Sequence, residues 1–183
     1  MVLLETSCKQ LAIPFLGLLH FSIQVYILFA YILLNLKTIA MNTQKFLVSG
    51  IVGGIVSFFA GYLIYGLALT DFFAKNAGTA TGVMRPMTDM IWWSVILGSI
   101  FMGLTFSYIF NRWANINSLS AGASAGAVIG LLMTAGTDFL MYGTSNLNNL
   151  TGTVVDVIAG TVMGAITGAA VGLANGMGAK KAV

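Results

Sequence analysis

The chain has 183 residues, of which 58% are apolar and only 7% are charged, and its mean hydropathy is +0.93. A soluble domain carries about 25% charged residues, so this composition excludes a water-exposed globular surface and predicts a protein surrounded by lipid. The net charge of +3 is small and the sequence contains no basic run, which argues against nucleic acid as a partner. One cysteine, Cys8, forms neither an intrachain disulfide nor a cysteine-based metal cluster.

The first apolar stretch covers residues 11–34 and contains few small residues. It is too long for the apolar region of a signal peptide and lacks a convincing A-x-A cleavage site. Met41 then opens MNTQKF, a short polar start that runs directly into the next apolar stretch. Two interpretations stay open: residues 1–40 form an extra transmembrane helix, or they are an upstream extension of a chain that starts at Met41. Under both, we expect residues 41–183 to be the functional unit.

Four further apolar stretches follow, at residues 46–69, 90–110, 119–142 and 153–174. Each has about 20 residues or more, enough to cross a hydrocarbon core of about 30 Å as a helix. None alternates polar and apolar residues as the strands of a membrane barrel do. The sequence therefore predicts an all-α, polytopic membrane bundle of four core transmembrane helices, with residues 1–40 as a candidate fifth.

The basic residues predict which side of the membrane each end faces. Two of them, Lys75 and Arg85, fall on one side of the predicted bundle. Five fall on the other side: Lys37, Lys45, Arg112, Lys180 and Lys181. Because cytoplasmic segments carry the excess of Lys and Arg, we expect the larger group, and with it the C-terminus, to be cytoplasmic.

Aromatic residues gather near the predicted helix ends and are typical of the two interfacial belts of a membrane protein. We interpret them as interface anchors: Tyr65, Trp92, Trp93 and Tyr142 outside, and Tyr108 and Trp113 inside. LIYG at 63–66 and LMYG at 140–143 each end a predicted helix, and together they form a weak internal repeat, called here the LIYG and LMYG echo.

Glycine recurs at every fourth position of the last predicted helix. In water each such glycine costs a helix about 1 kcal/mol relative to alanine. In lipid, helix association depends on close packing, and small residues let two backbones approach. Helix 119–142 repeats the pattern, and rows of serine and glycine follow helices 46–69 and 90–110. The rows predict helix-packing seams, the strongest of them formed by Gly122, Gly126, Gly130, Gly160, Gly164, Gly168, Gly172 and Gly176.

The two glycine rows end in aspartates. The first continues through Thr134 to Asp138, and the second, read backward from Gly160, reaches Asp156. The short loop between the two helices predicts antiparallel neighbours, with both carboxylates roughly 5–6 Å inside the apolar boundary. Two unscreened charges there are unfavourable, so the pair should share a proton, hold a cation or take a basic partner.

Arg85 and Lys75 lie on the same predicted side of the membrane and complete a candidate ion or proton site with Asp138 and Asp156. A structural alternative is that Asp156 and Asp89 cap helix N-termini, and that Asp71 is simply solvated. The sequence does not decide between these readings for Asp156.

Other chemistry is nearly absent from the sequence. There is no nucleotide-binding loop, no HExxH motif and no serine–histidine arrangement, so we expect no enzyme, no catalytic residue, no cofactor and no metal centre. The single histidine, His20, is interpreted as a lone polar residue in an apolar helix.

The order of motifs resembles a known family. GYLIYG closes the first core helix, a polar NxxNL turn precedes the last one, and DVIAGTVMGAITG opens it. Over about residues 46–174 this is similar to the small bacterial four-helix membrane proteins catalogued as domain of unknown function 1761. The resemblance implies a bacterial inner-membrane location and adds no mechanism.

Two functional hypotheses follow, of which the first is the main prediction and the second the alternative. The surplus of small-residue seams favours a packing or assembly protein that forms a homo-oligomer or joins a larger membrane complex. The Asp138–Asp156 pair instead favours a small transporter, or a cation- or proton-coupled carrier, with an outward-facing acidic cluster. In both cases the lipid bilayer is the surrounding medium.

Overall fold

The computed structural model describes residues 42–80 and 82–179, which belong to one compact unit, Met41–Val183. The expectations for residues 1–40, among them Cys8 and His20, and those for Lys180 and Lys181 lie outside the described residues.

The described part of the chain is helical. Its elements are, in chain order, α2 (Thr43–Gly61), the π-helix η1 (Tyr62–Ala68), α3 (Thr70–Lys75), the 3₁₀-helix η2 (Met87–Asp89), α4 (Trp92–Ile109), the π-helix η3 (Phe110–Ala114), α5 (Leu119–Thr144) and α6 (Leu150–Ala179). Within the described residues, four segments are long and apolar enough to cross a membrane: Thr43–Ala68, Trp92–Ala114, Leu119–Thr144 and Leu150–Met177. The prediction of an all-α bundle with four core membrane helices is confirmed, and the chain is an integral membrane protein.

Two helices begin three residues earlier than the hydropathy pattern predicts, because asparagine caps precede them. The side chain of Asn42 accepts a hydrogen bond from the Lys45 amide at 3.0 Å, and that of Asn149 accepts one from the Gly152 amide at 2.8 Å. Each cap satisfies an N–H group that the helix itself leaves free. The apolar runs therefore mark the membrane depth of a helix better than its first residue.

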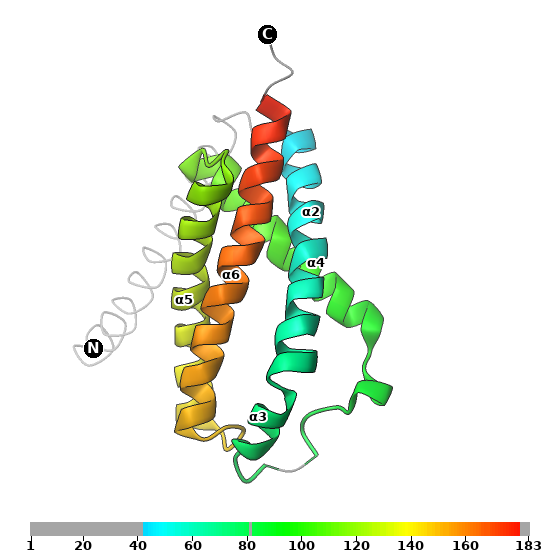
Figure 1. Cartoon of the computed structure of the whole chain (residues 1–183), viewed down its shortest axis with the longest axis vertical. Coiled ribbons are helices and arrows are strands. Elements are labelled where there is room, and N and C mark those ends of the chain that lie inside the picture. The colour runs from blue at the N-terminus through cyan, green and yellow to red at the C-terminus, as the bar shows by residue number, and fades with distance from the viewer. Residues whose placement is uncertain (1–41, 81, 180–183) are drawn as a thin grey trace, which may run out of the picture. The chain divides into compact units, whose positions relative to one another are not determined.

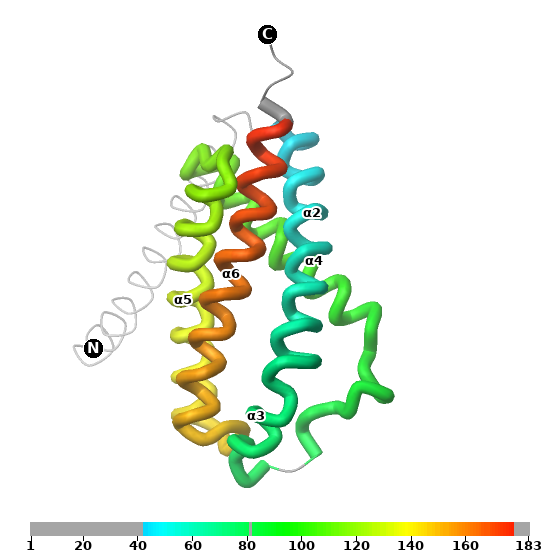
Figure 2. Tube along the Cα trace, in the orientation of Figure 1, coloured from blue at the N-terminus to red at the C-terminus, as the bar shows by residue number. Residues whose placement is uncertain are grey.

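Helix α6 is the centre of the bundle. It packs against α5 on one side and α2 on the other, while α4 packs mainly on α2 (Figure 1). The α2–α4 contact is close because glycines meet there: a Cβ atom added at Gly54 would lie 2.7 Å from Ile100 Cα. The start of α4 leaves this contact, and residues 91–98 are all exposed. Figure 2 shows α4 running away from α5 and α6 toward the end at which it begins.

Helices α5 and α6 meet backbone to backbone along the two glycine rows. A Cβ atom added at Gly130 would lie 2.7 Å from Gly160 O, and one added at Gly164 would lie 2.5 Å from Gly126 O. Real Cβ atoms do not approach backbone atoms so closely, so only glycine fits at these positions. Only Gly164 and Gly168 of the second row face glycines of α5 alone. Gly160 faces the Thr134 side chain, and Gly172 and Gly176 approach the backbone of residues 117–118, just before α5.

A polar network ties the helices together at the end where α2 begins and α6 ends. The hydroxyls of Ser49 and Ser107 are 2.7 Å apart, and Asn111 Nδ2 donates to Asn175 Oδ1 at 3.0 Å. Asn175 Nδ2 in turn donates to the backbone oxygen of Ile116 at 3.1 Å. We call this end of the bundle the network end, and the opposite end, which carries the long 69–91 connection, the loop end.

Apolar side chains seal the bundle next to this network. Phe106, Phe110 and Val171 form a buried cluster in which the two phenyl rings meet edge to face, with centroids 6.0 Å apart. Lys45 lies at the network end, where its Nζ donates to Asn117 Oδ1 at 2.6 Å. The core is small because glycine, not large side chains, fills most helix contacts, and many large apolar side chains face outward as they should in lipid.

Candidate functional site

At the loop end, the segment after α3 is hydrogen-bonded to the turn between α5 and α6. The amide of Gly78 donates to Leu147 O at 2.8 Å, and that of Ala80 donates to Asn146 O at 3.1 Å. The approach requires glycine, because a Cβ atom added at Gly78 would lie 2.7 Å from the carbonyl carbon of Asn146. The segment after α3 is thereby held against the turn between α5 and α6.

A cavity of about 690 Å³ lies beside these connections. It is lined by Asp138 of α5, Asp156 of α6, Tyr65 of η1 and Arg85 of the segment before α4. We call it the loop-end cavity. Three of the four residues that the sequence assigns to an ion or proton site thus line one space. The fourth, Lys75, is the exposed last residue of α3 and is not among the lining residues.

Tyr65 is held in the cavity wall by two contacts. Its hydroxyl donates to Asp156 Oδ1 at 2.7 Å, and its ring stacks on Phe73 of α3 with centroids 5.8 Å apart. It belongs to a π-helical segment, whose wider turn is seen in the bond from Leu69 N to Ile64 O at 2.8 Å. Such segments are rare and are frequently found at functional sites.

The interpretation of Tyr65 as an interface anchor is therefore incomplete. Tyr142, assigned to the same aromatic belt, also lines the cavity. The sequence did contain a signal for both residues, since Tyr65 and Tyr142 occupy the same place in the LIYG and LMYG echo. Trp93, in contrast, is 69% exposed, as an anchor in the interface would be.

The capping alternative for Asp156 is wrong. Helix α6 begins at Leu150 and is capped by Asn149, so Asp156 is its seventh residue and lies beyond the free N–H groups of the first turn. Asp89 does not cap α4 either, because the residue before that helix is Ile91 and no side chain caps it. Asp71 and Asp89 are exposed and are not lining residues of the cavity.

The carboxylate of Asp138 forms few hydrogen bonds with its neighbours. Its Oδ2 atom is buried without a hydrogen-bond partner, and its Oδ1 atom is 3.5 Å from the hydroxyl of Thr137. Within residues 42–80 and 82–179, no ion pair is found between either cavity aspartate and Arg85. The charged lining groups are two acids and one base, which leaves one net negative charge when all three are ionised.

Such a cavity suits a small ligand of single positive charge. A carboxylate at membrane depth is costly unless a counter-charge or a proton compensates it. No group of three or more His, Cys, Asp or Glu side chains that could hold a metal ion occurs among the described residues. The lining therefore offers an acidic pair with a tyrosine rather than a cage of charged ligands.

Comparison with known proteins adds no relative: no family model matches the chain, and no curated protein and no solved structure matches it either. The resemblance to the domain of unknown function 1761 family stays a prediction.

Proposed function

We propose that the protein is a small membrane carrier whose loop-end cavity takes up a proton or a monovalent cation. The observation that carries the proposal is the joint lining of one cavity by Asp138 and Asp156, which come from two tightly packed helices. The close glycine contact between α5 and α6 holds the two helices, and therefore the two carboxylates, in a fixed position relative to each other. This favours a defined binding site over a group of independently solvated acids.

The charge of the cavity supports the same ligand class. Arg85 balances one aspartate, so one added positive charge would make the lining neutral. The buried Oδ2 atom of Asp138 offers an acceptor that nothing in the described chain uses. Tyr65 donates to Asp156 and holds that carboxylate in place, leaving Asp138 as the acid available to a ligand.

Transport into liposomes tests this proposal. Purified protein is reconstituted, and proton movement and uptake of monovalent cations are followed with internal dyes. We expect transport by the natural protein, loss of transport in both Asp138→Asn and Asp156→Asn, and normal transport in Asp71→Asn, whose exposed carboxylate lies on α3 outside the cavity lining. Equal activity of Asp156→Asn and the natural protein, or no difference between protein-containing and empty liposomes, would contradict the proposal.

An assembly role is the second candidate. The glycine rows that motivate it are occupied within this chain, which weakens its basis. Gly136 and Gly143 of α5 still support it, since a Cβ atom added at either would meet nothing within 4 Å and the two are seven residues apart, on one helix face. The mass of the protein in mild detergent, measured by light scattering, tests it: a stable oligomer that Gly136→Leu dissociates favours assembly, and a monomer argues against it.

We further propose that the loop end faces outward, in a bacterial inner membrane, with the C-terminus in the cytoplasm. The uneven distribution of Lys and Arg supports this orientation. The test uses single cysteines in a Cys8→Ser background. Asn146→Cys, in the exposed turn after α5, should react in intact cells with a maleimide that does not cross membranes, whereas Thr43→Cys, at the start of α2, should not. The opposite labelling pattern would reverse the orientation.

A further inference from the structure

A second cavity, of about 210 Å³, lies in the middle of the bundle among α2, α4, α5 and α6. Tyr65 lines both this mid-bundle cavity and the loop-end cavity, so its side chain stands between the two spaces. On the other side, the mid-bundle cavity reaches Phe106, part of the apolar cluster beside the polar network. The cavity therefore adjoins the loop-end cavity, and it is not sealed from the surroundings, because the side chains of Met102 and Met133 that line it are 39% and 45% exposed.

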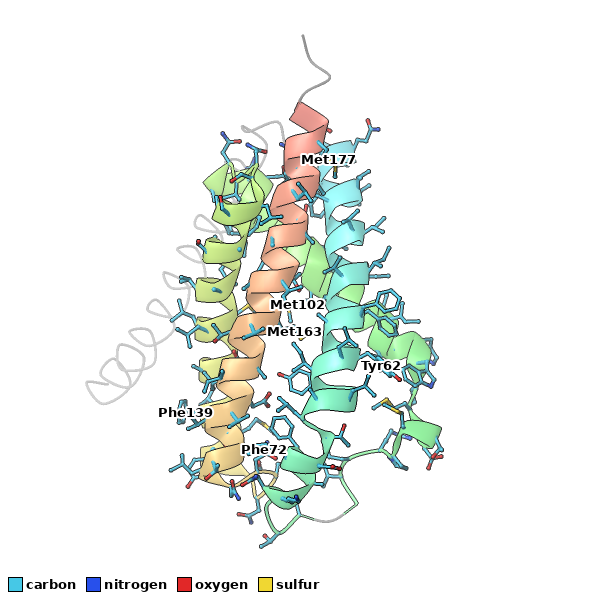
Figure 3. All side chains as sticks on the ribbon, in the orientation of Figure 1. Tyr62, Phe72, Met102, Phe139, Met163 and Met177 are labelled. Carbon is cyan, nitrogen blue, oxygen red and sulfur yellow. The ribbon has the colours of Figure 1, made fainter. Side chains whose placement is uncertain are left out.

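Methionine is the distinctive residue of both cavities. The described chain contains eight methionines, and all of them except Met177 line one cavity or the other. The mid-bundle cavity receives one from each of three helices: Met102 of α4, Met133 of α5 and Met163 of α6. Figure 3 shows Met102 and Met163 at the middle of the bundle and Met177 near its network end. The loop-end cavity is lined by four more: Met84, Met87, Met90 and Met141.

Two buried hydroxyls of the same cavity lack hydrogen-bond partners. Ser57 is 0% exposed and Thr167 is 1% exposed, and neither hydroxyl oxygen has a partner. Serine and threonine in a helix commonly bond the carbonyl four residues earlier. Many hydroxyls of this bundle do so, among them those of Ser49, Thr105 and Thr161. An unpaired buried hydroxyl is costly, so the two exceptions at one cavity indicate that water or a ligand occupies it.

The donor set selects the class of ligand. Thioether sulfur is a soft ligand that favours Cu(I), whereas hard cations such as Mg²⁺ and Ca²⁺ favour oxygen. We propose that the mid-bundle cavity binds a soft monovalent cation, Cu(I) or Ag(I), through the sulfur atoms of Met102, Met133 and Met163. This inference rests on the proposed carrier function and names its substrate class: the loop-end cavity, with one net negative charge and four methionines, receives the ion before Tyr65 admits it.

The competing explanation is packing. Methionine fills irregular gaps in apolar cores, and a cavity of this size also has room for several waters at about 30 Å³ each. The two explanations differ in what a leucine would do. Leucine conserves volume and replaces methionine in a core at small cost, but it has no sulfur to offer a cation.

The test is a binding titration with Ag(I) on the purified full-length protein in chloride-free buffer. Every variant carries Cys8→Ser, because a thiolate would bind silver by itself. Met102→Leu, Met133→Leu and Met163→Leu should each weaken binding by about tenfold or more, since even residues outside the first coordination shell are worth about that much to a metal site. Met177→Leu is the matched control and should leave the affinity unchanged, because Met177 lines neither cavity.

An X-ray absorption spectrum of Cu(I) bound to the Cys8→Ser protein gives a second readout that requires no substitution at the cavity. Sulfur neighbours around the metal are expected, and oxygen or nitrogen neighbours alone would overturn the proposal. So would an absence of Ag(I) binding, which would mean that waters or packing account for the cavity, or equal affinities in the three cavity variants and Met177→Leu. Failure here is distinguishable from failure of the carrier proposal, since Asp156→Asn can abolish transport of protons or another cation whether or not silver binds.

Discussion

The two ends of the bundle differ in whether their buried polar groups have hydrogen-bond partners. At the network end, Ser49, Ser107, Asn111 and Asn175 satisfy one another across three helices and η3. In the middle of the bundle Ser57 and Thr167, and at the loop end Asp138, keep polar atoms that are buried and without partners. Helix α6 runs through both regions, so the difference does not come from one helix being more polar. A satisfied polar network closes a membrane bundle, whereas unsatisfied polar atoms around a cavity leave it ready for a ligand.

Helix α4 accounts for much of this contrast. Near its C-terminal end it inserts Phe106 and Phe110 against Val171 of α6 and fills the interior. Near its N-terminal end residues 91–98 are exposed and no large side chain of that segment fills the interior. The loop end therefore keeps cavities where the network end has a core, and the following substitutions should separate the two behaviours.

The largest effect is expected where backbones touch. Gly164→Leu should lower the free energy of unfolding by about 3 kcal/mol or more, because overpacking a rigid contact forces the backbones apart. Gly164→Ala should be milder yet still destabilising, because its Cβ would lie 2.5 Å from Gly126 O. Gly136→Ala is the control, with open space around it, and should be neutral or slightly stabilising. Thermal unfolding in detergent measures all three, and an unchanged melting temperature in Gly164→Leu would refute the packing account.

A smaller loss is expected from the polar network. Asn175→Leu removes the acceptor of Asn111 Nδ2 and the donor to Ile116 O, and should cost about 1–3 kcal/mol because both groups stay buried. Asn146→Ala, in the exposed turn between α5 and α6, should change stability little. The same unfolding measurement applies. If the two variants are equally stable, the network does not close its end of the bundle.

The smallest effects are expected in the loop-end cavity, and there the two acids should differ. Tyr65→Phe removes the bond to Asp156 and should cost about 1 kcal/mol. Asp138→Asn should leave stability unchanged or raise it slightly, because the carboxylate has a buried oxygen without a partner and loses a charge. A clear loss of stability in Asp138→Asn would mean that this carboxylate is a structural group and not a free acceptor.

Much of the fold follows from the sequence because apolar length and glycine spacing are direct physical constraints. Runs of about 20 apolar residues predict the spans, and the rows containing Gly126 and Gly164 predict the faces that the structure brings together. Helix ends were less predictable, since the caps at Asn42 and Asn149 act through local hydrogen bonds that hydropathy does not reveal.

The candidate site was predictable in part. Asp138 and Asp156 could be found because each continues a glycine row whose geometry is regular. The LIYG and LMYG echo singled out Tyr65 but not its bond to Asp156, because its position depends on a π-helical turn and on stacking with Phe73. The methionines of the mid-bundle cavity were not predictable, since each is a single apolar residue of its own helix, and only the arrangement of α4, α5 and α6 around one cavity groups them.

The central claim is that the loop end is open to water and ions at a depth where the network end is closed. Asp156 and Ser49 form a matched pair, because each is the seventh residue of its helix, at opposite ends of the bundle. Asp156→Cys and Ser49→Cys, both in a Cys8→Ser background, are treated in permeabilised vesicles with a small, cationic, water-soluble thiol reagent. The account predicts rapid modification of the cysteine at position 156 and none at position 49 over the same time. Equal rates at the two positions would contradict it.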